Sequence, residues 1–383
     1  MIKKNICLIL ALCFAVFCCS FTAEAQLSDD KYSFEIEING DVIAFPLSFE
    51  EFTSLGWEYA EDDADEPLDS HYYEVAKRFN LNELECYASL INLSVNALPR
   101  KECLVAGFSV DSYQMESAPG TILKIPGGFE FGAATMQEVT AAYGSPTDTY
   151  EGDLYTKISY ELDYDRGISL YFDAQTEALN DIEIENFVEP EGFEAGEVSD
   201  EVPAIVQSYT APAELSDDLS DFVIDYAGAL YSLPAPVSEF IANGWEIIQD
   251  DTDTPIEGRG YGWVTLTYDN QKLRTIAENY SENATGIENC FITSVKADPY
   301  DARVEMTAAM GITLGMAEGE LMALIEASGL EYETEEGSSY NYYRIFAGQG
   351  VLDCYEIYAD SQDGLVYSIE VENAPAYEDF AAA

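Results

Sequence analysis

The sequence predicts an α+β protein of two tandem homologous domains, each an antiparallel sheet with short helices. The first observation is an internal repeat, since the block from Ser28 to Asp63 recurs 188 positions later and Asn92 recurs 187 positions later. The second is the alternation of apolar and charged residues in short segments, which is typical of half-buried antiparallel strands. The third is a set of capping signals that begin short helices between those segments.

The repeat places domain 1 at residues 28–186 and domain 2 at 216–373, followed by a tail at 374–383. Residues 187–215 mix prolines and glycines with acidic and small residues, which predicts an extended, solvated linker. We expect residues kept in both copies to be framework, and residues unique to one copy to be incidental or specialised. The recurring residues include Phe34, Gly40, Pro46, Trp57 and Asn186, which match Phe222, Gly228, Pro234, Trp245 and Asn373.

The N-terminal residues resemble an export signal. Lys3 and Lys4 precede an apolar run at 6–21, and Ala23 and Ala25 are small residues of the kind that a signal peptidase reads. We therefore expect residues 1–25 to be a signal peptide and the mature protein to be secreted. The alternative is a retained N-terminal anchor, although the apolar run is shorter than the roughly 20 residues that a membrane span needs. No membrane insertion is expected after residue 26.

The charge of the chain excludes some partners. It has 16 Lys and Arg against 73 Asp and Glu, a net charge of −57. Such a charge repels nucleic-acid phosphates and anionic lipids, so neither is an expected partner. Hydrophobic residues still make up 48% of the chain, enough for two packed cores. The acidic surface is either a generic feature of a secreted protein or a means of attracting cations and basic proteins.

Each copy is expected to open with a hairpin and a helix. Residues 34–38 alternate in polarity, and Asn39-Gly40 is the strongest short signal for a hairpin turn into a strand at 42–45. Ser48 and Glu51 form a capping box, and Gly56 suits the left-handed end of the helix. Further strands are expected at 72–76, 84–92 and 103–109, with counterparts at 263–268, 273–279 and 290–296.

The second half of each copy is expected to be a helix followed by a meander. Thr135 and Glu138 form a second capping box, and the helix should end at Gly144. Strands are expected at 158–164, 168–173 and 179–185, the last with an alternation that recurs at 368–372. One face of this sheet should be buried and the other acidic and solvated.

This second half resembles the helix-plus-antiparallel-sheet module of secreted β-lactamase inhibitor proteins and of small envelope-assembly lipoproteins. The resemblance covers about 128–186 and 311–373 and carries no functional residue across. It implies a protein that binds other proteins through sheet faces and loops. The second copy keeps Gly311, Gly315 and a helix through Leu321, but not the Tyr-Gly-x-Pro ending. The residues that carry the resemblance are Gly128, Gly132, Thr135, Glu138, Val139, Tyr143, Gly144 and Pro146.

Four cysteines follow the predicted signal peptide, two in each copy. Because export permits disulfides, we predict the pairs Cys86–Cys103 and Cys290–Cys354. Cys103 and Cys290 are equivalent, whereas their predicted partners are not. The alternative is four buried free thiols that act as small hydrophobic residues.

Catalytic and cofactor signatures are weak in this sequence. A nucleophile–histidine site would depend on His71, the one histidine in the chain, which lies in an acidic loop and is expected to be a surface residue. No nucleotide-binding fingerprint or zinc spacing is present, and no cofactor is expected. Two acidic loops recur, with oxygen ligands that calcium accepts. They lack the EF-hand pattern, so we interpret them as solvated turns without a metal. Their aspartates are Asp62, Asp63 and Asp65, and Asp250, Asp251 and Asp253.

Aromatic residues offer the candidate recognition surface. Trp57 and Trp245 recur after a helix-ending glycine, so we expect both in the core. Exposed aromatic residues anchor protein interfaces, and the candidates here are Trp263 and the cluster of Tyr340, Tyr342 and Tyr343. Burial of this cluster is the alternative.

These observations support a secreted, non-enzymatic binding protein, monomeric with two domains, that engages a protein or cell-surface partner through sheet faces and loops. One alternative is an extracellular hydrolase that acts on glycans through paired carboxylates. The other is an acidic structural or cation-binding surface protein.

Overall fold

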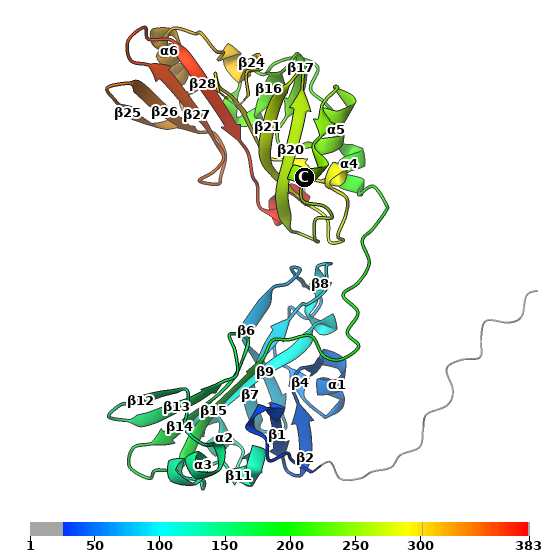
Figure 1. Ribbon diagram of the computed structural model, residues 1–383, viewed down its shortest axis with the longest axis vertical. Coiled ribbons are helices and arrows are strands. Elements are labelled where there is room, and N and C mark those ends of the chain that lie inside the picture. The colour runs from blue at the N-terminus through cyan, green and yellow to red at the C-terminus, as the bar shows by residue number, and fades with distance from the viewer. Residues whose placement is uncertain (1–25, 301, 382–383) are drawn as a thin grey trace, which may run out of the picture. The chain divides into compact units, whose positions relative to one another are not determined.

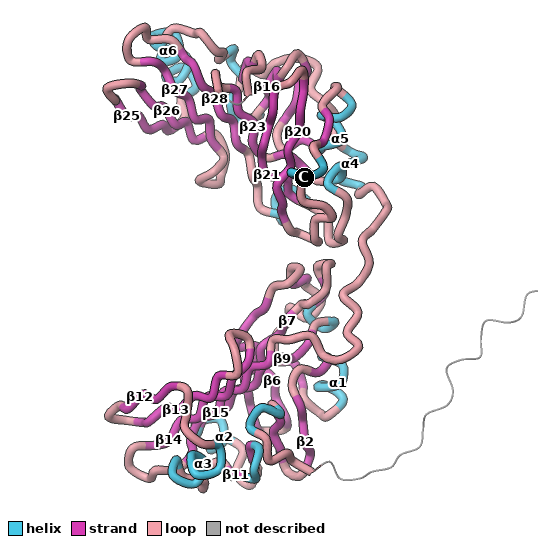
Figure 2. The backbone as a smooth tube through the Cα atoms, viewed as in Figure 1, coloured by secondary structure: helices cyan, strands magenta, loops and turns pink. Residues whose placement is uncertain are grey.

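The computed structural model describes residues 26–300 and 302–381. These residues form antiparallel sheets with a few short helices, in agreement with the sequence (Figure 2). The predicted signal peptide at 1–25 lies outside the described residues. Within the described part of the chain, every helix is too short or too polar to cross a membrane.

The chain divides into two compact units. Unit 1 comprises the residues up to Pro46 together with Phe79–Tyr87 and Ala106–Val188. Unit 2 comprises Leu47–Arg78, Ala88–Val105 and the residues from Glu189 onward. This division falls inside the first predicted domain, so the domain limits 28–186 and 216–373 stay a prediction.

Unit 1 contains the predicted hairpin. Strands β1 (Glu35–Ile38) and β2 (Asp41–Ala44) pair in an antiparallel register in which Ile38 faces Asp41. Asn39 and Gly40 both have positive φ, 54° and 98°, which the tight turn requires. The hairpin prediction is confirmed. Strands β10 (Leu123–Ile125) and β11 (Phe129–Glu130) complete a sheet in the order β11-β10-β1-β2.

The second sheet of unit 1 is the meander that the sequence predicts (Figure 1). Its helix α3 (Met136–Tyr143) begins with the capping box of Thr135 and Glu138 and ends at Gly144, as predicted. A short helix, α2 (Ser112–Ser117), follows β9. The order β12-β13-β14-β15-β9 is antiparallel throughout, and its strands are β12 (Asp148–Glu151), β13 (Tyr155–Glu161), β14 (Arg166–Asp173), β15 (Leu179–Asn186) and β9 (Leu104–Asp111).

The sheet continues past β9 through β7 (Leu84–Ile91), β6 (Tyr73–Leu81) and β4 (Glu58–Tyr59), with β3 (Leu47–Ser48) beside β9. Strand β6 is longer than the predicted 72–76. A separate short pair joins β5 (Pro67–Leu68) to β8 (Leu98–Pro99).

Helix α1 (Phe49–Ser54) has the predicted capping box, in which the side chains and backbone amides of Ser48 and Glu51 bond reciprocally. It buries Phe49 and Phe52. The ring of Phe52 stacks on Trp57 with the ring centroids 5.0 Å apart.

The part of unit 2 from Glu189 onward contains three sheets. Their orders are β17-β16-β24, β18-β22-β21-β20-β19 and β23-β28-β27-β26-β25. The first sheet has β16 (Val223–Tyr226), β17 (Ala229–Ser232) and β24 (Met306–Ala308). The second has β18 (Ala235–Pro236), β19 (Glu246–Ile247), β20 (Tyr261–Tyr268), β21 (Gln271–Glu278) and β22 (Phe291–Ile292). The third has β23 (Ser294–Ala297), β25 (Glu331–Glu336), β26 (Tyr340–Phe346), β27 (Cys354–Asp360) and β28 (Val366–Glu372).

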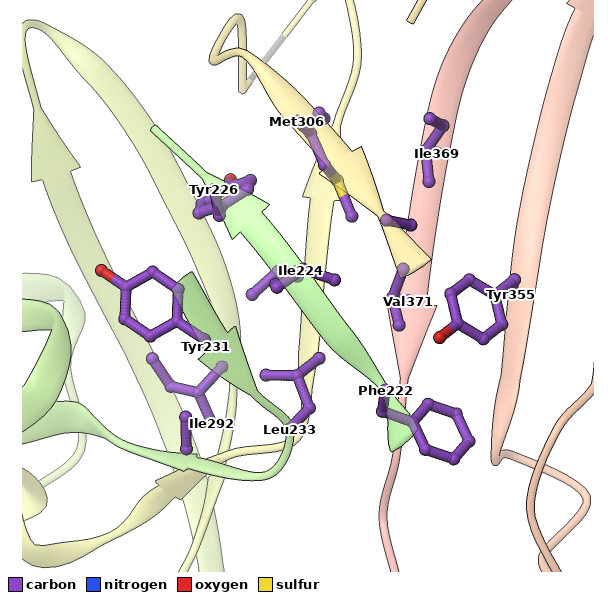
Figure 3. Close-up of a cluster of buried hydrophobic side chains, with 14 of the residues drawn as sticks. Phe222, Ile224, Tyr226, Tyr231, Leu233, Ile292, Met306, Tyr355, Ile369 and Val371 are labelled. Atoms are coloured by element: carbon purple, nitrogen blue, oxygen red, sulfur yellow. The ribbon is translucent and has the colours of Figure 1, made fainter. Parts of the chain in front are cut away.

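One hydrophobic core joins these sheets and helices α5 (Val237–Ala242) and α6 (Glu318–Ser328). Figure 3 shows its centre, where Phe222, just before β16, and Ile224 on β16 approach Tyr355 and Val371 of the third sheet. Leu321 and Ile325 of α6 join the same core, so α6 packs on the inner face of the third sheet.

Two further short helices lie outside this core. The predicted linker is not extended throughout, because Ala204–Ser208 form one turn of helix, α4. Tyr377–Ala381 form α7 within the predicted tail.

Candidate functional site

The solvent face of the unit 1 meander carries tyrosines and carboxylates. Strands β13, β14 and β15 alternate, so that Ile158, Leu170 and Ile182 are buried while the residues between them point the other way. On that other face Lys157 is directly opposite Tyr171, and Tyr171 is directly opposite Asp181. We call Tyr150, Tyr155 and Tyr171 the first tyrosine face.

The rings of this face are in contact. Tyr155 lies 5.7 Å from Tyr150 and 5.4 Å from Tyr171, measured between ring centroids. Tyr150 is 54% exposed and Tyr155 is 37% exposed. Accessible aromatic side chains on a sheet face are of the type that anchors protein interfaces.

An ammonium group lies on the first tyrosine face. Lys157 Nζ is 5.0 Å from the centroid of the Tyr171 ring and 3.5 Å from Glu183 Oε2. The Tyr171 hydroxyl donates a 2.9 Å hydrogen bond to the same Glu183 oxygen. Burial would lower the pKa of Lys157, but hydrogen bonding to Tyr171 and attraction to Glu183 outweigh it and raise this pKa. The face therefore stabilises a cation that the chain itself supplies.

Carboxylates crowd the neighbouring part of the same face. Burial, followed by repulsion from Glu183 and Asp111, raises the pKa of Asp181 to about 7. Burial also raises the pKa of Glu185, with Glu183 as the second cause. Both groups bind protons more tightly than ordinary carboxylates do, and Asp181 changes charge near neutral pH.

The solvent face of the third sheet in unit 2 has a similar set. Tyr358 lies 5.4 Å from Tyr340, 5.0 Å from Tyr342 and 6.3 Å from Tyr367, measured between ring centroids. The Tyr342 hydroxyl donates a 2.9 Å hydrogen bond to Glu356. We call these four tyrosines the second tyrosine face.

Strand register relates the two faces. Strand β14 has a bulge between Tyr171 and Phe172, and β27 has one between Tyr358 and Ala359, 187 positions later. The residue opposite Tyr171 is Lys157, whereas the residue opposite Tyr358 is Tyr342. The positions that keep their residue type are Tyr155 and Tyr340, Tyr171 and Tyr358, Glu183 and Glu370, and Glu185 and Glu372.

The predicted recognition residues divide between the core and the surface. Tyr340 and Tyr342 lie on the second tyrosine face, but Tyr343 points into the core, where it is 6% exposed and its hydroxyl donates to Glu318. Trp263 on β20 is 45% exposed, and the guanidinium of Arg274 lies 4.8 Å from its ring centroid. Of the predicted cluster, only Tyr343 is thus fully buried.

The other singled-out residues have local roles. Trp57 and Trp245 are buried, as expected of framework residues. His71 is exposed in a turn.

The carboxylates of the acidic loops bond to other residues of the chain. Asp63 pairs with Lys77 at 2.9 Å, Asp65 pairs with Lys101, and Asp253 accepts a hydrogen bond from the backbone amide of Trp263. Among the described residues, no group of three or more His, Cys, Asp and Glu side chains is arranged to hold a metal.

The four cysteines are separate buried thiols in this structure. Cys86 lies on β7 and Cys103 just before β9, while Cys290 precedes β22 and Cys354 begins β27. Burial raises the pKa of each thiol. The pairs Cys86–Cys103 and Cys290–Cys354 stay a prediction, which mass spectrometry of the unreduced exported protein would decide.

Sequence reasoning missed a cluster of charges in which Arg100 is buried and its partners are partly buried. Arg100 donates to both oxygens of Glu74, at 2.7 and 2.6 Å, and Lys77 lies 3.0 Å from the same carboxylate. The repeat contains a signal that could have revealed this cluster. Lys77 and Arg100 match Val264 and Ile287, 187 positions later, and both of these residues are apolar and buried. A charged residue at a position that is apolar in the other copy indicates a charge in a buried setting.

A second feature missed from sequence is a cavity of about 450 Å³ in unit 2. Lys272, Arg274 and Lys296 line it together with Asp251 and Asp298. Three cations in one cavity are unusual in so acidic a chain. Two of them are paired, because Lys272 lies 3.9 Å from Asp251 and Lys296 lies 3.9 Å from Asp298. This cavity is therefore partly neutralised by the chain's own residues.

Searches against protein-family models, curated proteins and solved structures found no match for this chain.

Proposed function

We propose that this chain is a secreted, non-enzymatic binding protein that engages a protein or cell-surface partner through its two tyrosine faces. The observation that carries the proposal is the recurrence of Tyr155 and Tyr171 as Tyr340 and Tyr358 on the solvent side of equivalent strands. Two homologous α+β domains, one for each face, are part of the same proposal.

The recurrence of tyrosine at these positions is not explained by packing of the core. A buried residue such as Ile184 recurs as Val371 because the core needs an apolar side chain there. No core constrains the solvent face, where polar residues of many kinds would be tolerated. A tyrosine supplies a large, rigid contact area with a polar tip, which favours a role in recognition.

Two sequence features support the remaining parts of the proposal. Residues 1–25 have the composition of a signal peptide, which supports export. The resemblance of 128–186 and 311–373 to the module of secreted β-lactamase inhibitor proteins supports binding through sheet faces, because both tyrosine faces lie in those segments.

A glycan-directed hydrolase is the second candidate, and one observation favours it. Asp181 has its pKa raised to about 7 and lies near Glu183 and Asp111, as expected of a carboxylic acid that donates a proton beside a carboxylate. The equivalent position in the second copy is Ser368, and the cavity of about 450 Å³ lies at other residues. Binding is therefore the better-supported function.

The decisive experiment compares two variants of the exported chain. The face variant carries Tyr→Ser at Tyr155, Tyr171, Tyr340 and Tyr358. The control variant carries Tyr→Ser at four tyrosines that are highly exposed outside both faces, namely Tyr72, Tyr113, Tyr164 and Tyr261. Each protein is immobilised and incubated with the culture supernatant and cell-wall fraction of the producing organism.

We expect the natural protein and the control variant to capture the same partner, and the face variant to lose it while keeping a cooperative melting transition. Retention of the partner by a folded face variant would contradict the proposal. Release of reducing sugars from the cell-wall fraction, abolished by Asp181→Asn, would instead favour the hydrolase.

A further inference from the structure

The two tyrosine faces differ at the position that supplies the cation. On the first face, Lys157 places its ammonium 5.0 Å from the Tyr171 ring centroid. On the second face, the residue opposite Tyr358 is Tyr342, so the ammonium is replaced by another ring. The aromatic surface is thus larger in the second copy, and no lysine lies directly opposite Tyr358 as Lys157 lies opposite Tyr171.

The cations near the second tyrosine face are paired with its carboxylates and not with its rings. Arg344 lies 3.6 Å from Glu356, and its guanidinium is 5.3 Å from the ring of Phe346. Lys296 lies 3.6 Å from Glu370. Among the described residues, no Lys or Arg lies over the ring of any of the four tyrosines of this face.

The rings themselves are suited to a cation. Tyr358 is inclined by 66° to Tyr340 and by 46° to both Tyr342 and Tyr367. The edge of an inclined ring covers at most one face of its neighbour and leaves the opposite face of that neighbour uncovered. The negative faces of the π systems therefore remain available to attract an ammonium group.

Resting on the proposed binding function, we propose that the second tyrosine face is a site for alkylammonium groups and that its occupant is a lysine-rich segment of a basic partner protein. The first face shows the chemistry: tyrosine rings beside a glutamate hold an ammonium on an extended alkyl stem. The second face presents tyrosine rings beside glutamates that Lys296 and Arg344 already pair with, so an ammonium over its rings must come from another molecule.

Charge complementarity supports this choice of occupant. The edge strand β25 has the sequence Glu-Tyr-Glu-Thr-Glu-Glu, with every residue exposed, and Glu333 and Glu335 are opposite Arg344 and Tyr342. The net charge of −57 adds a long-range attraction for basic partners. Carboxylates at the border of the rings favour a cationic segment over a neutral one.

The test uses the whole exported chain and tetralysine as the probe, with binding measured by calorimetry at 0.15 M salt. Tetralysine acetylated on its side chains keeps the alkyl stems but loses the ammonium charges. We expect one tetralysine per chain and no binding of the acetylated peptide. Tyr358→Leu should weaken binding roughly two- to fivefold, as expected for one exposed cation–π contact, whereas Tyr113→Leu, at an exposed tyrosine outside both faces, should leave it unchanged.

Two register-matched exchanges sharpen the test. Tyr342→Lys installs the first copy's own ammonium and should abolish tetralysine binding. Lys157→Tyr removes that ammonium from the first face and should raise the stoichiometry from one peptide to two. Because both exchanges lie on a solvent face, the fold should persist, which melting curves would verify.

Equal binding by the natural chain, Tyr358→Leu and Tyr342→Lys would overturn the assignment and attribute the attraction to the general negative charge. If tetralysine does not bind and the face variant still loses the partner, the ammonium site is rejected and the proposed function stands. If tetralysine does not bind and the face variant keeps the partner, both the ammonium site and the proposed function are rejected.

Discussion

Arg100 donates two hydrogen bonds to Glu74 in a nearly buried ion pair, although its equivalent 187 positions later is the buried Ile287. Asp63 and Lys77 complete the cluster, with Lys77 within 3.0 Å of both carboxylates. Hydrogen bonds from Arg100 and Lys77 outweigh burial and lower the pKa of Glu74, so the cluster holds its charges. Where the first sequence repeat has the cations Arg100 and Lys77, the second has the buried apolar residues Ile287 and Val264.

This ion cluster predicts that removal of one partner destabilises the protein more than replacement of three partners by apolar or aromatic residues. Arg100→Ala should destabilise the protein by on the order of 3 kcal/mol, because it removes the guanidinium that donates two hydrogen bonds to the partly buried Glu74. Replacement of three residues by their second-copy equivalents, Arg100→Ile, Lys77→Val and Glu74→Tyr together, should recover at least half of that loss. Urea unfolding curves of the three proteins measure both effects.

Lys101→Ala is the matched control, because Lys101 is a neighbouring but exposed cation whose ion pair with Asp65 contributes little. A triple variant as unstable as Arg100→Ala would show that the two copies do not share a common framework at these positions.

The parts of the fold that sequence predicts well depend on local signals. The turn at Asn39-Gly40 needs only two residues that accept positive φ, and the capping boxes at Ser48 and Thr135 need only a partner three residues away. These signals are complete within a few residues of chain. They therefore predict the hairpin and both helix starts without knowledge of tertiary structure.

Non-local pairing determines the rest. The predicted strand at 290–296 is broken at Thr293, because β22 pairs with β21 whereas β23 pairs with β28 in another sheet. The equivalent strand in the first copy, β9, is continuous. Pairing partners so distant in sequence leave no local mark.

The same limit applies to the candidate site. Residues 340–343 offer tyrosines on both faces of β26, so periodicity does not reveal which face is buried. The register of Tyr343 with Ile357 decides it, since both point into the core. The Arg100 cluster escaped prediction because its members come from three separate segments, namely the loop of Asp63, strand β6 and the turn at Arg100.

The raised pKa of Asp181 predicts a pH-dependent stability. Its pKa is about 7 in the folded protein against 3.8 ordinarily, so the folded state binds the proton more tightly than the unfolded state does. The stabilisation is fully present below about pH 4 and is lost as pH rises to 7. Asp181→Asn should therefore raise the melting temperature at pH 8 relative to the natural protein, with a smaller difference at pH 4.

Asp153→Asn, at an exposed position of the same unit, serves as the charge-matched control. It removes one negative charge without removing a buried carboxyl. If it shifts the melting temperature as much as Asp181→Asn at every pH, the effect comes from net charge and not from burial of Asp181.

Burial of the four thiols predicts low reactivity in the native state. The pKa of Cys103 is raised to about 12, mainly by burial, so its thiolate is scarce at neutral pH. In protein purified under reducing conditions, we expect iodoacetamide to label none of the four until denaturant is added, and then to label all four. Mass spectrometry counts the labels.

In protein exported through an oxidising compartment, the predicted pairs would leave no thiol to label even after unfolding. Rapid labelling of native, reduced protein would contradict the buried environment of these residues, because a buried thiol of raised pKa reacts only when the structure opens.

The acidic loops predict a test with divalent cations. Asp63 already pairs with Lys77 and accepts from Tyr59, and Asp65 pairs with Lys101. Calcium would have to displace these cations, so we expect no calcium-selective binding. Calcium and magnesium should raise the melting temperature equally and slightly, by screening the net charge of −57.

Melting curves in calcium, in magnesium and in sodium chloride of matched ionic strength measure this, for the natural protein and for a variant with all six loop aspartates changed to Asn. A true site would stabilise by about 2.7 kcal/mol at a hundredfold excess of calcium over its dissociation constant. A calcium-selective shift of that size, absent from the Asn variant, would make the loops metal sites and the ion pairs of Lys77 and Lys101 features of the metal-free state alone.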